Sequence, residues 1–377
     1  MPSSRSMRVA VVSHTYVIQA NRGKVEFLAR LPGLEVLVVV PNKWRNRDIG
    51  QRFVAETSQP GPLRVVPLPA WSFGSGSLIT YAAVALWRQL RRFRPDVVHL
   101  EEEPWSVAAL ELCLICRMLG TQLTFFTWEN TERRLLQPLR VIRGWTLLRA
   151  RAAVAGSAKG KALLERQGFT RPVIVLPQLG VDTSAFRPAN SAAQGIVVGY
   201  VGRLVSQKGL QVLLEAVARL PSAVRMMVVG NGPLKDEFLK KARELGLNGR
   251  LELHEGAPHD QVPRFLEQMS VLVLPSLTTP TWREQFGHVL IEAMACGVPV
   301  VGSDSGAIPE VIGDAGLVVP EGNVEALAAA LRRLISTPAL CADLAARGLA
   351  RVQAEYTNDS VARRLAEFWE SVAGRSG

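Results

Sequence analysis

Long hydrophobic runs are scarce in this sequence of 377 residues. The longest candidate, residues 106–120 (SVAALELCLICRMLG), is interrupted by Glu111 and is shorter than the roughly 20 apolar residues that a membrane-spanning helix needs. We therefore expect a buried helix there. The first residues of the chain place only a short apolar stretch before polar residues, which predicts a first β-strand rather than a signal peptide. Both features predict a cytoplasmic protein.

Cysteine is also rare, with four residues in the chain. Cys113 and Cys116 form a Cys-x-x-Cys pair, but the pair lies inside an apolar helical pattern with no second Cys or His pair nearby. A structural zinc site needs further ligands, and a redox pair needs a strand-to-helix turn. We therefore assign both thiols to core packing rather than to metal binding or redox chemistry.

Signals of nucleic-acid binding are missing too, because the sequence has no zinc-finger spacing, no aromatic RNA-binding motif and no long basic tail. The net charge of +11 is unevenly distributed, since residues 1–190 carry +13 and the remainder carries −2. Arginine alternates with Leu, Ile and Trp in residues 87–95 and 132–152. This pattern favours helices on an anionic membrane surface, and a solvated basic face explains it equally well. We expect no nucleic-acid partner.

Apolar strand-like runs alternate with helical patterns along the whole chain. Its length exceeds what one hydrophobic core usually serves, so two domains are expected. Repeated strand–helix units predict an α/β fold with parallel, doubly wound sheets. We place an N-terminal domain at residues 1–186, a C-terminal domain at 187–355 with its linker within 186–194, and a C-terminal helix at 356–377 that can cross back to the N-terminal domain. The predicted strands are residues 8–13, 35–40, 64–69, 96–101, 121–127, 152–157, 173–177, 195–202, 224–230, 250–256, 271–276 and 298–304.

Residues 284–301 (EQFGHVLIEAMACGVPVV) carry the most specific functional signal. The segment follows a strand-like run and a loop, so Glu284 is expected just before a helix N-terminus and Glu292 about two turns inside the helix. The backbone amides of residues 286–288 would then face a ligand at the positive end of the helix dipole. An anion that also carries hydroxyls, such as a sugar diphosphate, fits this place. In the alternative, Glu284 only caps the helix and Glu292 faces solvent.

Two cations are predicted to join this anion site. Arg203 and Lys208 both follow the strand-like run 199–202, and Lys208 opens a helical pattern, so their charges converge near another helix N-terminus. Ligands of open α/β sheets bind beyond the carboxyl ends of the strands, here in the cleft expected between two sheets. The two side chains form a candidate diphosphate clamp, whose alternative is an ordinary surface position. Because they supply the positive charge, no metal is required, and no Asp-x-Asp at a strand end is present to hold one.

The segment 284–301 resembles the E-x7-E region of family 4 of the retaining glycosyltransferases, which have the GT-B fold of two Rossmann-like domains. Four further segments resemble motifs of that family, and all five occur in the family's order. The resemblance extends from about residue 150 to the C-terminus. The further segments are LPQLGVDTSAFRP (176–188), GYVGRLVSQKG (199–209), VVGNGPLKDEF (228–238) and SGAIPEVI (305–312).

The resemblance implies a retaining, metal-independent glycosyltransferase that moves a sugar from a UDP- or GDP-linked donor to a hydroxyl of a glycan or lipid-linked acceptor, without a cofactor. It implies that Glu284 contacts the transferred sugar, that Glu292 contacts the nucleotide ribose, and that Arg203 and Lys208 stabilise the departing diphosphate. The acceptor is implied to bind the N-terminal domain and the donor the C-terminal domain. The implied donor-binding residues are Gly202, Gly230, Gly232, His254, Gly256, Phe286, Gly287, His288, Val289 and Glu292.

The N-terminal half departs from the family pattern in two loops. A Gly-Gly pair often follows the first strand in the family, whereas residues 17–30 contain only Gly23. The loop after residues 121–127 often carries a His, whereas here Glu129 or Asn130 would bind the sugar hydroxyl. Gly23, Glu129 and Asn130 are the candidate acceptor-side residues. Because the Gly-Gly pair and the His are missing, a non-catalytic nucleotide-sugar-binding subunit is an alternative function. A nucleotide-sugar epimerase on the same fold is a further alternative.

Two histidines, His14 and His99, each stand at the end of a strand-like run. Either could reach a ligand at the carboxyl edge of a sheet. A lone histidine at such a place is more often structural than catalytic, so we assign neither to the site.

Overall fold

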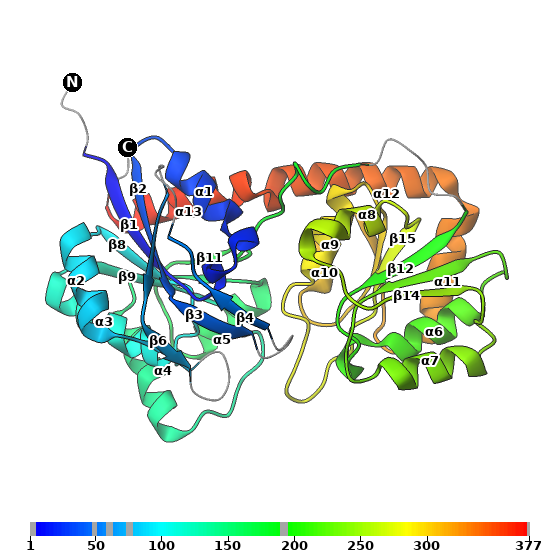
Figure 1. The fold of residues 1–377 in the computed structure, drawn as a ribbon, viewed down its shortest axis with the longest axis horizontal. Helices are drawn as coiled ribbons and strands as arrows, with labels where there is room; N and C mark the ends of the chain where they lie inside the picture. The colour runs from blue at the N-terminus through cyan, green and yellow to red at the C-terminus, as the bar shows by residue number, and fades with distance from the viewer. Residues whose placement is uncertain (1–4, 47–50, 58–62, 73–77, 189–194, 375–377) are drawn as a thin grey trace. The chain divides into compact units, whose positions relative to one another are not determined.

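The computed structural model describes residues 5–46, 51–57, 63–72, 78–188 and 195–374. The chain forms two compact units, which are described separately below (Figure 1). Unit 1 comprises Met1–Gly180 together with Asn358–Gly377, and unit 2 comprises Val181–Thr357.

The boundary between the units therefore follows Gly180, whereas the sequence analysis places it after residue 186. The reason lies in two contacts inside unit 2. Val181 forms a β-bridge with Thr357, and the ring of Phe186 lies 5.3 Å from that of His259. Most of the predicted linker, residues 189–194, lies outside the described residues.

Unit 1 is built on a seven-stranded parallel sheet. Its centre is rich in β-branched residues, as in the run LEVLVVVP, and these side chains are buried on both faces, as expected for a parallel sheet. All seven strands predicted for this half are confirmed. In spatial order the strands are β11 (Val173–Val175), β10 (Ala152–Ala155), β9 (Gln122–Thr127), β8 (Val97–Leu100), β1 (Met7–Val12), β2 (Leu34–Pro41) and β5 (Arg64–Leu68).

Two antiparallel hairpins accompany this sheet, and the sequence analysis did not predict them. Each strand has only three or four residues, so none shows a strong alternation of apolar and polar positions. They are β3 (Lys43–Asn46) with β4 (Gln51–Val54), and β6 (Ala70–Ser72) with β7 (Ile79–Tyr81).

The apolar segment 106–120 forms helix α3 (Val107–Leu119), as predicted. The Ser106 side chain caps its N-terminus by accepting a hydrogen bond from the amide of Ala109, and Gly120 ends the helix in a left-handed conformation. Cys113 and Cys116 are buried and free, and burial raises the pKa of both thiols. Within the described part of the chain, no helix is both long and apolar enough to cross a bilayer.

The other long helices of unit 1 cover its sheet, and the last of them comes from the end of the chain (Figure 1). Helix α13 (Asn358–Val372) packs against α1, with Trp369 fully buried and its ring 5.2 Å from that of His99. The C-terminal helix thus completes the core of unit 1. The remaining helices are α1 (Gly23–Arg30), α2 (Ala83–Phe93), α4 (Gln137–Arg149) and α5 (Ala158–Arg166).

Unit 2 contains a six-stranded parallel sheet with helices on both faces (Figure 1). The five strands predicted for this half are confirmed, and β17 at the edge was not predicted. In spatial order the strands are β14 (Leu251–His254), β13 (Arg225–Val229), β12 (Val197–Val201), β15 (Val271–Leu274), β16 (Val300–Ser303) and β17 (Gly316–Val319). The helices are α6 (Leu210–Ala218), α7 (Lys235–Glu244), α8 (Val262–Leu266), α9 (His288–Ala295), α10 (Ile308–Ile312), α11 (Val324–Ser336) and α12 (Pro338–Arg351).

Removal of the Trp369 indole should destabilise unit 1, because it leaves a large cavity under α13. We expect Trp369→Ala to lower the free energy of unfolding by about 3–5 kcal/mol in guanidinium denaturation. The matched control is Trp145→Ala on α4, whose side chain is 45% exposed and which should change stability by less than about 1 kcal/mol. Equal effects of the two substitutions would contradict the docking of α13.

Candidate active site

The carboxyl edge of the unit 2 sheet holds an ion pair between Lys208 and Glu284. Lys208 ends a short 3-10 turn that follows β12, and Glu284 lies in the loop between β15 and α9. The Nζ atom of Lys208 is 2.6 Å from Oε2 of Glu284. Glu284 is 6% exposed, so the pair is largely withdrawn from water and its attraction is stronger than at a surface. The fold thus brings together two of the three predicted catalytic residues.

Two neighbours hold this pair in place. The hydroxyl of Ser276, which follows β15, donates a hydrogen bond of 2.7 Å to the same carboxylate oxygen of Glu284. The Nζ atom of Lys208 lies 5.2 Å from the centre of the Trp282 ring, within the range of a cation–π contact. The sequence analysis assigned neither residue. The position of Ser276 at the end of a strand-like run was the signal that could have found it.

Arg203, the third predicted catalytic residue, also follows β12 and is exposed. Its carbonyl accepts a 2.8 Å hydrogen bond from the hydroxyl of Tyr200, which fixes the backbone of this loop. Burial, and secondarily the charge of Glu284, raises the pKa of Tyr200, so its hydroxyl remains a donor at neutral pH.

The predicted donor-site glycines lie where the loops after β12 and β13 touch. A Cβ atom on Gly230 would lie 1.8 Å from the carbonyl oxygen of Gly202, and one on Gly232 would lie 2.4 Å from that of Leu204. Any side chain would collide with backbone at both positions. Packing between these loops therefore requires glycine there, whether or not a ligand approaches.

Helix α9 begins later than predicted. Gly287, with φ of 81°, is its N-cap in a left-handed conformation, and the helix starts at His288. Glu292 consequently lies about one turn inside the helix rather than about two. It is also 6% exposed, so the alternative in which Glu292 faces solvent is wrong.

Glu292 is held by two histidines. His259 Nε2 lies 2.8 Å, and His288 Nδ1 3.0 Å, from Oε1 of Glu292. Although burial alone would raise the pKa of Glu292, the hydrogen bonds from His259 and His288 lower it to about 2. The same bond to Glu292 raises the pKa of His259. The carboxylate is therefore ionised at neutral pH, and the sequence analysis missed His259 because it comes from a different part of the sequence.

His288 also carries an unsatisfied polar atom. Its Nε2 is buried and has no hydrogen-bond partner among the described residues. Buried polar groups without partners are rare in native proteins, and a bound ligand is one way to satisfy them.

Four predicted donor-site residues remain. Phe286 is buried, with its ring 5.7 Å from that of Tyr356, so its side chain packs in the core. Val289 is half-buried in the first turn of α9. His254 ends β14 with its ring 4.6 Å from that of Phe265, and Gly256 follows with φ of 84°.

The three candidate acceptor-side residues belong to unit 1. Glu129 and Asn130 follow β9 and are buried, and Oε1 of Glu129 accepts a 2.9 Å hydrogen bond from the indole of Trp105. Gly23 is instead the first residue of α1, where a Cβ atom would lie 2.4 Å from Nδ2 of Asn358. Close packing of α1 on the start of α13 thus explains this glycine.

Comparison with known families covers both units. Residues 182–351 match the model of the family described as "Glycosyl transferases group 1", and residues 25–185 match that of "Glycosyltransferase Family 4". The GDP-mannose-dependent alpha-(1-6)-phosphatidylinositol monomannoside mannosyltransferase of Mycobacterium tuberculosis is 30% identical over 91% of this chain and 92% of its own length. The chain belongs to the group 1 glycosyltransferases.

Other relatives of this glycosyltransferase agree. The amylovoran biosynthesis glycosyltransferase AmsK of Erwinia amylovora is 30% identical over 84% of this chain and 79% of its own. The structure of Anabaena Alr3699/HepE in complex with UDP matches with a TM-score of 0.75 at 18% identity, over 97% of this chain and 100% of that one. Sucrose-phosphate synthase from Thermosynechococcus elongatus matches with a TM-score of 0.73 at 20% identity, over 98% and 100%. The units are therefore the two Rossmann-like domains of the GT-B fold.

The loop that carries Lys208 depends on Gly209. This glycine has a φ of 67°, and a Cβ atom added to it would lie 1.9 Å from the carbonyl oxygen of Pro275. Gly246 has a similar φ of 70° but no atom near a Cβ. We expect Gly246→Ala to lower the free energy of unfolding of this glycosyltransferase by about 1–2 kcal/mol, because alanine is strained in a left-handed backbone. Gly209→Ala should lower it by about 1–3 kcal/mol more, as measured by denaturant unfolding. Equal costs would show that the approach to Pro275 does not constrain the loop.

Proposed function

We propose that this glycosyltransferase is retaining and metal-independent, and that it moves a hexose from a UDP- or GDP-linked donor to a hydroxyl of a glycan or lipid-linked acceptor. The observation that carries the proposal is the Lys208–Glu284 ion pair at the carboxyl edge of the unit 2 sheet, a short distance along the chain from the start of α9. It puts a cation, a carboxylate and the positive end of a helix in one region of unit 2.

Lys208 and Arg203 are assigned to the donor diphosphate. As the bond between the sugar and the diphosphate breaks, negative charge grows on the leaving phosphate, and cations fixed beside it stabilise the transition state more than the ground state. Glu284 is assigned to the hydroxyls of the transferred sugar, because an ionised carboxylate accepts hydrogen bonds from them. Its contact with Lys208 orients both groups before the donor binds.

Glu292 is assigned to the ribose of the donor nucleotide. Its low pKa keeps it ionised, and hydrogen bonds from His259 and His288 fix its orientation. The unsatisfied Nε2 atom of His288 offers one more polar group to a ligand at this place. The names of similar proteins support the two nucleotides proposed: one relative is GDP-mannose-dependent, and solved structures of Anabaena Alr3699/HepE contain UDP or UDP-glucose.

Calorimetric titration with UDP, GDP and ADP tests the donor assignment. We expect one of the first two to bind, and Arg203→Ala to weaken that binding. Arg333→Ala, an exposed arginine on α11, is the control that should leave affinity unchanged. Lys208→Ala should lower turnover about a hundredfold or more, by the loss of one transition-state charge donor. Binding of no nucleotide, or near-normal turnover of Lys208→Ala, would contradict the proposal.

We also propose that unit 1 contacts an anionic membrane, as a lipid-linked acceptor requires, and that the protein is cytoplasmic and peripheral. On α4, Val141, Trp145 and Leu148 are 56%, 45% and 64% exposed, and their spacing of three and four residues places them on one face. On α3, which packs against α4, Leu114 and Met118 are 46% and 66% exposed. Residues 137–149 contain three arginines and no acidic residue. An apolar face flanked by arginine fits lipid headgroups of negative charge.

A liposome flotation assay tests this contact. The protein should float with vesicles that contain anionic lipid and should remain in the soluble fraction with neutral vesicles. Combined substitution of Val141, Trp145 and Leu148 by Ser should abolish flotation, because each residue loses its apolar side chain. Val318→Ser, at an exposed valine of unit 2, is the control that should float normally. A wild-type protein that stays soluble with both vesicles would refute the contact.

A further inference from the structure

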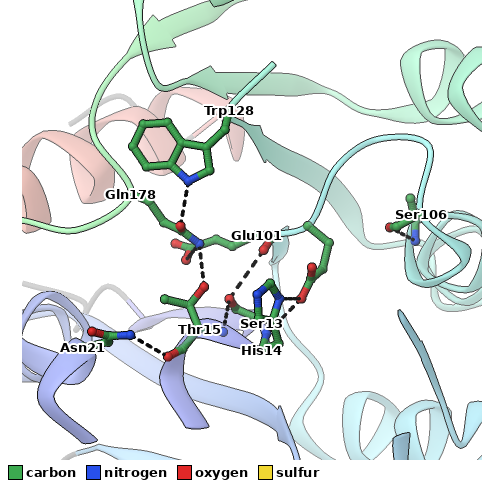
Figure 2. A network of polar contacts seen from close by, with 10 residues as sticks. Ser13, His14, Thr15, Asn21, Glu101, Ser106, Trp128 and Gln178 are labelled. Atoms are coloured by element: carbon green, nitrogen blue, oxygen red, sulfur yellow. Dashed lines mark hydrogen bonds and ion pairs between the residues drawn. The ribbon is translucent and has the colours of Figure 1, made fainter. Parts of the chain in front are cut away.

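The carboxyl edge of the unit 1 sheet gathers a second group of charges, part of which Figure 2 shows. Three consecutive glutamates follow β8, and each has a different partner. Lys24 Nζ is 2.6 Å from Glu101, His14 Nδ1 is 2.6 Å from Glu102, and the hydroxyl of Thr127 donates a 2.6 Å hydrogen bond to Glu103. These pairings offset the cost of placing carboxylates in the interior.

The pair formed by Lys24 and Glu101 is closed to solvent. Lys24 is 1% exposed, and Oε2 of Glu101 accepts a further hydrogen bond from Gln178 at 3.2 Å. Gln178 also bonds to Thr15 and accepts a hydrogen bond from Trp128, as Figure 2 shows. With its members satisfied and buried, this pair serves the structure of unit 1 rather than a ligand.

The pair formed by His14 and Glu102 differs, because it reaches the surface. The His14 side chain is 29% exposed, while that of Glu102 is 2% exposed. Oε1 of Glu102 accepts hydrogen bonds from both Nδ1 and the backbone amide of His14, the latter at 2.9 Å. A carboxylate on Nδ1 selects the tautomer that keeps its proton there and leaves a lone pair on Nε2. Among the described residues nothing hydrogen-bonds to Nε2.

A pocket lies beside this histidine, and Trp44 connects the two. The ring of Trp44 is 4.3 Å from that of His14, and Trp44 also lines a pocket of about 600 Å³ between the two hairpins. The volume is that of a ligand site. Phe53 and Trp71 add aromatic walls that suit the apolar face of a sugar ring. The lining also contains the cations Lys43, Arg45 and Arg52, and none of the described residues that line the pocket is a carboxylate.

We propose that His14, oriented by Glu102, accepts a hydrogen bond from a hydroxyl of the sugar acceptor, and that the acceptor extends past Trp44 into this pocket. The cations indicate an acceptor glycan that carries a negative group such as a phosphate. The inference rests on the proposed function, since it assigns the acceptor side of the same reaction. Glu102 acts as a positioning residue, through His14.

The proposal has a pH dependence with a defined sign. Burial alone would lower the pKa of His14, but the charge and hydrogen bond of Glu102, and the charge of Glu101, raise it above 6.5. Tyr81, another titratable group near Glu102, stays protonated because burial raises its pKa. Only neutral His14 accepts a hydrogen bond at Nε2, so sugar binding is present above the raised pKa and is lost as pH falls through it. Pairing with Glu102 stabilises the fold in the opposite sense, below that pKa.

The five histidines of the chain provide the readout, because two lie in unit 1 and three in unit 2. Their Cε1–H signals are followed by NMR in the whole protein, with each assigned by substitution with Gln. Glucose 1-phosphate should shift the Cε1–H signal of His14. A sugar hydroxyl that donates a hydrogen bond to Nε2 should also lower the pKa of His14. His99 is the internal control, since burial lowers its pKa to about 4 and keeps it neutral. UDP or GDP should shift His254, His259 or His288 instead.

Two variants separate binding from structure. Glu102→Gln should lower the pKa of His14, so that sugar binding persists to a more acidic pH. A purely structural pair would not produce this effect. Combined Arg45→Gln and Arg52→Gln should weaken glucose 1-phosphate severalfold and leave methyl glucoside unchanged, whereas Arg92→Gln, an exposed arginine of α2, should change neither.

The outcomes distinguish this inference from the proposed function. If glucose 1-phosphate and methyl glucoside both leave the His14 signal unmoved, or shift only histidines of unit 2, the acceptor role of His14 is overturned. If UDP and GDP shift no histidine of unit 2 while the sugar shifts His14, the donor assignment fails and the acceptor subsite stands.

Discussion

A lysine–glutamate pair at the carboxyl edge of the parallel sheet is the interaction on which each unit depends. In unit 2 Lys208 meets Glu284, and in unit 1 Lys24 meets Glu101. An unpaired charge at either place would carry a large desolvation cost, so each residue constrains the position of its partner. The two pairs differ in access to solvent, since the side chain of Lys208 is 20% exposed and that of Lys24 only 2%. The first pair is therefore accessible to solvent, and the second joins the start of α1 to the loop after β8.

Much of the fold and part of the site could be predicted from local sequence. Runs of Val and Leu give the strands of both sheets, and the position of Lys208 and Glu284 after strands places both at the same edge. The start of α9 could not be predicted, because Gly287 delays the helix through its left-handed conformation, which spacing alone does not reveal. The contact of His259 with Glu292 depends on tertiary packing between residues 33 apart.

The packing role of several glycines could not be predicted from the sequence either. A match to a family motif suggests that Gly202, Gly230 and Gly232 make room for a ligand. The structure shows that these loops also press backbone against backbone, so the same residues serve packing. Gly23 lies against Asn358, which belongs to a helix more than 300 residues later in the chain. No pattern near Gly23 could have indicated that neighbour.

Unit 1 is formed by two separate parts of the chain, because α13 packs on the N-terminal part. Unit 2 is continuous from Val181 to Thr357. During synthesis the ribosome releases all of unit 2 before α13 appears, so unit 2 can fold while unit 1 still lacks the helix that carries Trp369. Until then the surface that receives α13 is uncovered apolar area on a long-lived partial domain, which is the kind of species that chaperones bind. The core of unit 1 is therefore completed only after all of unit 2 has been synthesised.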